Sequence, residues 1–355
     1  MALRVLAVAQ AAEPGGAELA LLRLVEPLAA DGVELELAVP ADGGVAGAAR
    51  ALGVPVHELP VGGLRRGGWP RAVLAWPRAR SLVRRVRPDV VLLNGIVPQR
   101  LVPALGDTPV VIWLHDIVGR RPLVWRSGRF WRAVRAVACA SGAVANAAVQ
   151  VGRAPGPLSV IAAPVEAVAP AQRPSWADGP AVVGFVGRFE PRKGVLILLD
   201  AAEALAERVP DLRVVLVRGP GLGPDRGYEQ RVLDRAAGLG DRVIVTGPVE
   251  DARALMPWFD VLCVPSLVEP FGTVAAEALA AGTPVVVTDS GGMPEYVTSG
   301  EVVAPGNPEQ LAGALERVLE RAPEMAESAR ADVARFATAR VASDLAALLR
   351  ESAGR

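Results

Sequence analysis

Two glutamates eight positions apart, Glu269 and Glu277, lie in the segment whose residue types most clearly suggest chemistry. An apolar run at 261–264 precedes them and predicts a buried parallel strand, and the Ala-rich residues 272–281 predict a helix. The start of a helix offers backbone N–H groups and a positive dipole end to phosphate, whereas carboxylates accept hydrogen bonds from hydroxyls. The segment therefore favours a ligand that carries both phosphate and several hydroxyl groups.

The sequence Gly-Arg-Phe-Glu-Pro-Arg-Lys-Gly at 187–194 places two cations, Arg188 and Lys193, between a predicted strand and a predicted helix. A diphosphate needs about two cations to offset its charge as it leaves. Lys193 is the one lysine in a chain with 38 basic residues, which favours a compact ammonium over a wide guanidinium at this position. Chance retention of a lysine on a solvated surface is the alternative.

Three more glycine-bearing turns follow predicted strands in the same half, at 219–221, 245–249 and 290–295. The turn at 245–249 is suited to presenting backbone groups to a nucleotide base. Because the carboxyl ends of parallel strands meet at one edge of a sheet, we expect all five turns to converge there. That edge would then hold two cations and two carboxylates.

In the N-terminal half, a glycine pair and a histidine also follow predicted strands. Gly15 and Gly16 lie between a strand and a helix, where glycine lets backbone come close to a ligand. His115 directly follows the strand at 110–114, at the edge where ligands of open α/β sheets gather, so we expect it to belong to a site. His57 is expected to be structural or exposed.

Strand and helix patterns alternate along the whole chain, which predicts two α/β domains, each a parallel sheet with helices on both faces. The Pro- and Ala-rich residues 166–180 lack periodicity and predict a linker. We expect domains at 1–165 and 181–337, with a C-terminal helix at about 338–355 completing the first, and a small-molecule site in a cleft between them. Strands are predicted at 3–9, 34–39, 56–59, 90–93, 110–114, 136–140, 158–162, 181–186, 213–217, 243–246, 261–264 and 284–288, and helices at 17–30, 71–87, 194–208, 229–239, 309–321 and 328–349.

The composition indicates a globular chain. Its 355 residues are 51% hydrophobic and 21% charged, enough apolar content for a core in each half. No apolar run is long enough for a membrane span, and residues 1–9 are interpreted as the first strand rather than a signal peptide. Cys139 and Cys263 both lie in apolar runs, so we expect reduced core cysteines, no disulfide framework and no metal cluster. These features favour a cytoplasmic protein.

The net charge is zero, but the two halves differ. Residues 1–170 contain 19 arginines and 12 acidic residues, a net charge of +7, and the remainder carries −7. The basic charge is concentrated at 65–135, where Trp69, Trp76, Trp125 and Trp131 lie among the arginines. Solvated helix faces, an anionic acceptor and a peripheral contact with a membrane surface are all consistent with this pattern.

Together these motifs resemble those of retaining glycosyltransferases of the GT-B fold, in glycosyltransferase family 4 (glycosyl transferases group 1, the glycogen-synthase-like superfamily). The resemblance covers nearly the whole chain and is most specific at the Glu-x7-Glu motif of Glu269 and Glu277. It implies an α/β fold of two Rossmann-like, doubly wound parallel-sheet domains facing across a cleft. It also implies His115, Arg188, Lys193 and Glu269 as catalytic residues and Gly15, Gly16, Gly187, Gly219, Val249, Phe271, Gly272, Thr273, Val274 and Glu277 as donor-binding residues.

The resemblance implies transfer of a hexose-type sugar from a nucleotide-diphosphate sugar, with uridine favoured over guanosine. The acceptor would be a hydroxyl of a glycolipid or polysaccharide precursor or of a natural product. The anomeric configuration would be retained, and no metal, other cofactor or nucleic acid is implied. Glu277 would bind ribose hydroxyls and Glu269 the hydroxyls of the donor sugar. Residues 162–165 lack an Asn-Gly pair that is frequent in the family, and residues 92–95 lack its usual histidine, so the acceptor cannot be inferred.

Two other functions use the same fold. A nucleotide-sugar epimerase, or a coupling enzyme that joins non-sugar rings, would release nucleotide or alter the donor without a glycosylated acceptor. A non-catalytic subunit would bind nucleotide without turnover. The presence of Arg188, Lys193, Glu269 and Glu277 argues against the subunit.

Overall fold

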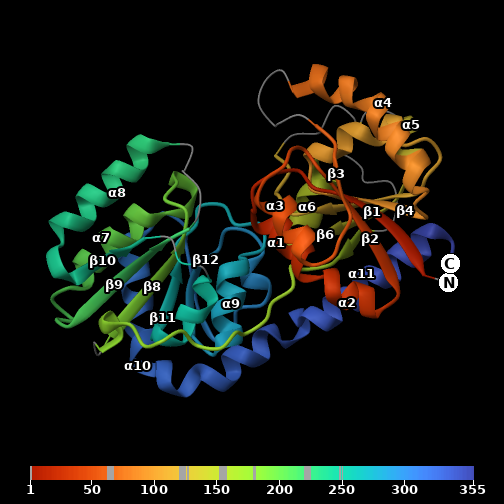
Figure 1. The fold of residues 1–355 in the computed structure, drawn as a ribbon. Helices are drawn as coiled ribbons and strands as arrows, with labels where there is room; N and C mark the ends of the chain where they lie inside the picture. Colours follow the sequence, from red (N-terminus) through yellow and green to blue (C-terminus); the bar gives the residue numbers. More distant parts are fainter. Residues whose placement is uncertain are drawn as a thin grey trace. The chain divides into compact units, whose positions relative to one another are not determined.

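The computed structural model describes residues 2–61, 68–119, 125, 128–151, 158–178, 181–219, 225–247, 249 and 251–355 (Figure 1). The chain divides into two compact units. The first unit is Met1–Pro164 with Phe336–Arg355, and the second is Val165–Arg335.

The first unit contains a seven-stranded sheet in the order β3-β2-β1-β4-β5-β6-β7, with every pair parallel. The order reverses beside β1, as in Rossmann-like folds, and the carboxyl ends of β1 and β4 flank that point. Its strands are β1 (Leu3–Val8), β2 (Val33–Val39), β3 (Val56–Glu58), β4 (Val90–Asn94), β5 (Val110–Leu114), β6 (Val134–Cys139) and β7 (Leu158–Val160). Its helices are α1 (Gly16–Arg23), α2 (Val25–Ala30), α3 (Gly44–Ala51), α4 (Gly68–Val86), η1 (Val97–Ala104), α5 (Gly128–Ala133), α6 (Gly142–Gln150) and α11 (Thr338–Ala353).

The second unit contains a six-stranded parallel sheet in the order β10-β9-β8-β11-β12-β13. Strands such as β11 are continuous apolar runs because helices cover both faces of a parallel sheet. Its strands are β8 (Ala181–Gly187), β9 (Leu212–Arg218), β10 (Val243–Thr246), β11 (Val261–Val264), β12 (Val285–Thr288) and β13 (Gly300–Val303). Its α-helices are α7 (Val195–Leu205), α8 (Arg226–Gly238), α9 (Thr273–Ala281) and α10 (Pro308–Val333), and its 3-10 turns are η3 (Ser175–Asp178), η4 (Pro191–Lys193), η5 (Gly240–Arg242), η6 (Ala252–Trp258) and η7 (Met293–Glu295).

The expected α/β class with two doubly wound parallel sheets is confirmed, and several element boundaries differ. The sequence pattern did not predict β13, because Gly300–Val303 is short and half polar. The single helix expected at 17–30 is two helices, which meet at Leu24 just before Pro27. Helix α10 continues through Pro323 to Val333, well beyond the expected end at 321.

The C-terminal segment expected as one helix at 328–349 is interrupted by the 3-10 turn η8 (Ala334–Phe336). After that turn, α11 packs against α2 and strands β4, β5 and β6, all of the first unit. The chain therefore leaves the second unit at its end and completes the first.

The stretch expected as a linker, residues 166–180, is packed against the second unit over its described part. The Ala171 amide donates to the Ala254 carbonyl (2.8 Å), and the Trp258 indole donates to the Ala171 carbonyl (3.0 Å). Trp176 is buried and stacks on Phe259, with 5.3 Å between ring centroids. The described part of this stretch is therefore ordered by contacts within the second unit.

The two cysteines, Cys139 and Cys263, are buried and free. Within the described part of the chain, no three His, Cys, Asp or Glu side chains form a group that could hold a metal ion. None of the described helices combines the length and apolar character that crossing a membrane requires.

Candidate functional site

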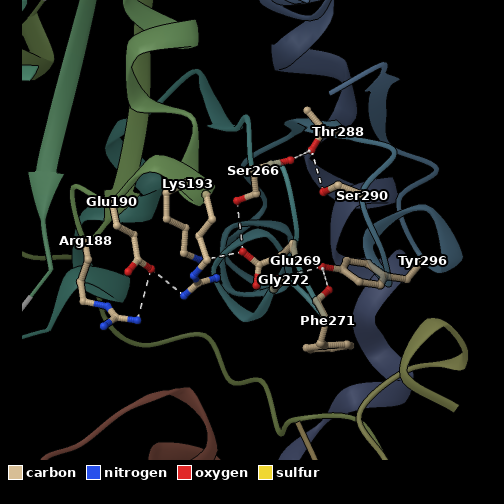
Figure 2. Close-up of polar contacts among 11 residues, drawn as sticks. Arg188, Glu190, Lys193, Ser266, Glu269, Phe271, Gly272, Thr288, Ser290 and Tyr296 are labelled. Atoms are coloured by element: carbon tan, nitrogen blue, oxygen red, sulfur yellow. Dashed lines mark hydrogen bonds and ion pairs between the residues drawn. The ribbon is translucent and has the colours of Figure 1, made fainter. Parts of the chain in front are cut away.

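The turns after β8, β11 and β12 bring the predicted charged residues together at the carboxyl edge of the second sheet (Figure 2). Lys193 Nζ lies 2.6 Å from Glu269 Oε2, and both side chains are mostly buried. The Ser266 hydroxyl donates to the same carboxylate oxygen at 3.1 Å. An ammonium has three N–H donors, so the ion pair leaves Lys193 able to donate to ligand oxygens as well.

Gly194 explains why Lys193 can approach this loop so closely. Its φ of 68° is in the left-handed region, and a Cβ there would lie 2.0 Å from the carbonyl oxygen of Pro265. Any other residue would push η4 away from the loop that carries Glu269. The Lys-Gly pair in the sequence is therefore a geometric requirement of the ion pair.

A buried carboxylate that the sequence analysis did not select organises the neighbouring cations. Glu190 is 5% exposed, and its Oε1 lies 3.3 Å from Arg188 Nη2 and 2.7 Å from Arg192 Nη2 (Figure 2). The two guanidiniums are partly exposed, so Glu190 holds both at the surface beside Lys193. Arg192 thus joins Arg188 as a third cation at this edge. The signal was present as the alternating charges of Arg188, Glu190 and Arg192.

The α9 turn, residues 271–274, supplies the backbone part of the site. Gly272 is the N-cap of α9 with φ 86° and ψ 50°, and its carbonyl accepts from the amides of Ala275 and Ala276. The amides of Thr273 and Val274 have no acceptor inside the helix, because the first residues of any helix lack one. The turn therefore presents donors and the positive end of the α9 dipole.

Glu277 lies one helical turn after Thr273 and is 9% exposed. The Asp251 carboxylate raises the pKa of Arg253, and Glu277 contributes to the same shift, so Arg253 and Glu277 lie near enough to interact. Phe271 is buried before the N-cap. The structure thus places Phe271, Gly272, Thr273, Val274 and Glu277 on one turn and the helix that follows it.

The loop of Glu269 is held by the turn after β12. The Glu269 amide donates to the Ser290 carbonyl (2.7 Å), and the Gly292 amide donates to the Glu269 carbonyl (3.2 Å). The Thr288 hydroxyl donates to the Ser266 carbonyl and lies 2.9 Å from the Ser290 hydroxyl (Figure 2). These bonds fix the Glu269 backbone, so its carboxylate has a defined direction.

The remaining predicted residues of the second unit lie on the turns after β8, β9 and β10. The Gly219 amide donates to the Gly187 carbonyl (2.9 Å), and a Cβ at Gly219 would come within 3.2 Å of the Arg188 amide. The glycine therefore allows the β9 turn to lie directly against the turn of Arg188. Val249 is partly buried beyond β10. Residues 220, 221 and 248 of the predicted turns lie outside the described residues.

Gly15, Gly16 and His115 belong to the first unit. Gly15 is the N-cap of α1, and a Cβ there would lie 3.0 Å from Glu18 Oε2, whereas a Cβ at Gly16 would meet nothing within 4 Å. Glu18 is 2% exposed, and this burial raises the pKa of its carboxyl group. Backbone hydrogen bonds at Gly15 and neighbouring residues offset only part of that rise. Glu18, which the sequence analysis did not select, therefore lies inside the turn that carries the glycine pair.

His115 is oriented by Asn94, another residue that the sequence analysis did not select. Asn94 is fully buried at the end of β4, and its Nδ2 donates to the Ala17 carbonyl at 2.9 Å. Its Oδ1 must then accept from His115 Nε2, 2.8 Å away. This assigns the proton to Nε2 and leaves Nδ1 as an acceptor. The same amide ties His115 to the first turn of α1.

Burial lowers the pKa of His115 to about 3, so its ring is neutral at physiological pH. Asn94→Asp is expected to place a carboxylate beside Nε2 and raise the pKa of His115, because a neighbouring negative charge stabilises the imidazolium. If Nδ1 accepts a hydrogen bond from substrate, the protonated ring is inactive. The variant should then lose roughly tenfold in kcat per pH unit below its new pKa, and the wild type should show no loss from His115 between pH 5 and 8.

Asn94→Ser separates this charge effect from lost orientation, because serine is neutral and short. It should lower kcat by a factor that does not depend on pH. A pH profile of Asn94→Asp parallel to that of the wild type would show that the charge of His115 is irrelevant to turnover.

Comparison with known protein families assigns both halves of the chain. The family described as Glycosyltransferase Family 4 matches residues 14–167, and the family described as Glycosyl transferases group 1 matches residues 170–334. The chain belongs to the group 1 and family 4 glycosyltransferases. With its two parallel-sheet units it has the GT-B fold, as the sequence motifs predicted.

Curated relatives are similar over part of their length. A D-inositol 3-phosphate glycosyltransferase of Corynebacterium urealyticum is 36% identical over 180 residues, which is 48% of this chain and 42% of that protein. A phosphatidyl-myo-inositol mannosyltransferase of Mycobacterium leprae is 39% identical over 142 residues, 38% of this chain and 36% of that one. A 2-deoxystreptamine glucosyltransferase of Streptomyces kanamyceticus is 38% identical over 156 residues, 42% of this chain and 39% of that one. The matched segments thus span about two-fifths of these relatives.

Solved structures are similar over the whole chain. Anabaena Alr3699/HepE in complex with UDP has a TM-score of 0.80 and 25% identity, covering 98% of this chain and 100% of that one. It has also been solved with UDP-glucose, and with UDP and glucose. Sucrose-phosphate synthase of Thermosynechococcus elongatus has a TM-score of 0.79 at 21% identity, covering 98% of both chains, which shows a shared fold.

Proposed function

We propose that this glycosyltransferase-family chain is a retaining enzyme that moves a hexose-type sugar from a nucleotide-diphosphate sugar to a hydroxyl acceptor, using UDP in preference to GDP. The observation that carries the proposal is the arrangement of Lys193, Glu269 and the α9 turn at one sheet edge. Cations and helix amides suit a diphosphate, and the adjacent carboxylates suit the hydroxyls of ribose and sugar. The UDP and UDP-glucose complexes of Alr3699/HepE support the choice of nucleotide.

In the proposed reaction, the bond between the anomeric carbon and the phosphate oxygen breaks, and the acceptor oxygen forms a bond to the same face of that carbon. The acceptor proton passes to the departing phosphate oxygen. Lys193, Arg188 and the amides of the α9 turn stabilise the negative charge that develops on the diphosphate. Glu269 orients the hydroxyls of the donor sugar. Charge neutralisation is thus assigned to these groups, with no metal ion required.

A panel of nucleotide diphosphates tests the nucleotide. At about 100 times its dissociation constant, a ligand should add about 2.7 kcal/mol to the free energy of unfolding, and UDP should raise the melting temperature more than GDP. If no nucleotide diphosphate raised it, the proposed function would be wrong. Incubation with UDP-glucose, with and without a hydroxyl acceptor, separates the alternatives. A transferase consumes the donor when the acceptor is added, an epimerase alters the donor without an acceptor, and a binding subunit leaves it unchanged in both cases.

The names of the curated relatives guide the choice of acceptor. Two refer to inositol derivatives and one to 2-deoxystreptamine, all six-membered carbocycles with several polar substituents. We therefore propose a cyclitol-type hydroxyl as the first acceptor class to assay. Proton NMR of the product should show the anomeric configuration of the donor, and an inverted product would contradict the retaining reaction.

The exposed face of α4 supports a peripheral contact with an anionic membrane surface. The helix sequence contains arginines and no acidic residue, and Leu74 is 74% exposed. A groove of about 510 Å³ is lined by Trp76, Pro77, Arg80, Ser81 and Arg84. Arginines beside an indole and an exposed leucine suit a lipid headgroup region.

Sedimentation with vesicles tests this contact. Arg80→Ala combined with Arg84→Ala should weaken binding to phosphatidylglycerol vesicles by about 30-fold, because each arginine near such a surface contributes about 1 kcal/mol. The control pair Arg208→Ala and Arg317→Ala lies on the second unit and should have no effect. Equal sedimentation of the wild type with phosphatidylglycerol and with uncharged phosphatidylcholine would contradict the proposal.

A further inference from the structure

The hydroxyl of Tyr296 bonds directly to the backbone of the α9 turn. It donates to the Gly272 carbonyl at 2.8 Å and to the Phe271 carbonyl at 3.1 Å (Figure 2). Tyr296 follows η7 on the turn after β12, 24 residues from Gly272, and the side chain is 3% exposed. A tyrosine hydroxyl has one proton, so the two carbonyls share a single donor.

Tyr296 also leaves no space for a side chain at Gly272. A Cβ at Gly272 would lie 2.9 Å from the Tyr296 oxygen and 2.5 Å from Met293 Cγ, and the left-handed φ of 86° already favours glycine there. The Tyr296 ring packs on Phe271, with 5.3 Å between centroids. The two carbonyls are therefore held on the side of the turn that faces Tyr296, and the Gly272 carbonyl also caps the amides of Ala275 and Ala276.

The hydroxyl keeps its proton in this environment. Burial raises the pKa of Tyr296 well above its ordinary value, and Glu269, Glu277 and Glu295 raise it further. The group therefore remains a donor throughout the neutral range. Glu269 and Glu277 therefore lie near enough to influence the Tyr296 hydroxyl.

We propose that Tyr296 is a positioning residue that fixes the α9 turn so that its amides are directed at the diphosphate of the donor. This proposal rests on the proposed function. In a trans peptide unit the amide of the next residue points away from the carbonyl. The Phe271 and Gly272 carbonyls held by Tyr296 therefore direct the amides of Gly272 and Thr273 to the other side of the turn, where an anion can accept from both. Without the hydroxyl the turn can rotate, and the donors lose their common direction.

Tyr296→Phe removes the hydroxyl and keeps the ring. It should weaken UDP binding by about tenfold, as expected for the loss of one hydrogen bond that orders the site, and leave uridine binding unchanged. The matched control is Tyr228→Phe at the only other tyrosine of the sequence, which is also a buried residue and loses a hydroxyl 3.4 Å from the Leu196 amide nitrogen. That variant should lose stability without any change in UDP binding.

The ratio of UDP to uridine affinity separates a positioning role from packing, because loss of packing would weaken both ligands or neither. If the wild type bound UDP and Tyr296→Phe bound it equally well, the role of Tyr296 would be refuted and the proposed function would stand. If the wild type failed to bind UDP, the proposed function itself would fail.

Discussion

Lys193→Ala is expected to lower kcat by about 10²- to 10³-fold, the usual effect of removing one group that stabilises charge in a transition state. The ammonium lies 2.6 Å from Glu269, on the turn after β8 that also carries Arg188, so it is placed to stabilise the diphosphate as it leaves. Lys193→Arg should recover little activity, because the side chain is only 17% exposed and a planar guanidinium is wider than an ammonium. Steady-state kinetics with UDP-glucose measures the change.

Lys193→Ala also leaves the Glu269 carboxylate without its cation, which costs about 1–3 kcal/mol of folding stability. Combining Lys193→Ala with Glu269→Gln removes that unpaired charge, so the melting temperature should recover while turnover stays low. If the double variant recovered both its melting temperature and its turnover, the only role of Lys193 would be to neutralise the Glu269 carboxylate. If Lys193→Ala kept full turnover, Lys193 would have no role in the mechanism.

Glu277→Gln is expected to weaken UDP binding by about 10- to 100-fold, since hydrogen bonds to a charged group contribute about 1.5–3 kcal/mol. The residue is 9% exposed on α9, one turn beyond the helix start, where a carboxylate can bind the ribose next to the phosphates. The wild type should bind UDP more tightly than 2′,3′-dideoxy-UDP, and the variant should bind the two alike. Calorimetric titration gives the four dissociation constants.

The matched control is Glu324→Gln, an exposed position on α10 with the same chemical change. It should retain the preference for the ribose hydroxyls in full. If Glu277→Gln retained that preference too, its carboxylate would not contact the ribose, and the assignment of the Glu-x7-Glu motif would have to be revised.

The sequence predicted the fold and the charged residues of the second unit because both depend on local patterns. Apolar runs followed by glycine-bearing turns predict parallel strands whose carboxyl ends lie at one edge of a sheet. Lys193 and Glu269, 76 residues apart in the sequence, meet at that edge because they lie on two such turns. Boundaries were less predictable where tertiary packing overrides a local signal. The helix predicted at 309–321 ends before Pro323, yet α10 packs on α7 and α9 and continues through that proline to Val333.

The residues that orient the site could not be predicted, because their partners are distant in sequence. Nothing near Asn94 indicates that its amide bridges Ala17 and His115, and nothing near Tyr296 indicates two carbonyls 24 and 25 residues earlier. Glu190 is the exception, since its partners Arg188 and Arg192 are two positions away on either side. The charged residues of the site can thus be predicted from local sequence, whereas most of the residues that orient them by hydrogen bonds are identified only from the folded structure.

Calorimetric titration of UDP into the wild type and into the Lys193→Ala, Glu277→Gln double variant tests the central claim most directly. The two residues are assigned to different groups of the same ligand, the diphosphate and the ribose, so their effects on binding should add. We expect one UDP per chain in the wild type and a loss of affinity of about 10³-fold or more in the double variant. Equal affinity in the two proteins would show that the nucleotide does not bind at this edge of the sheet.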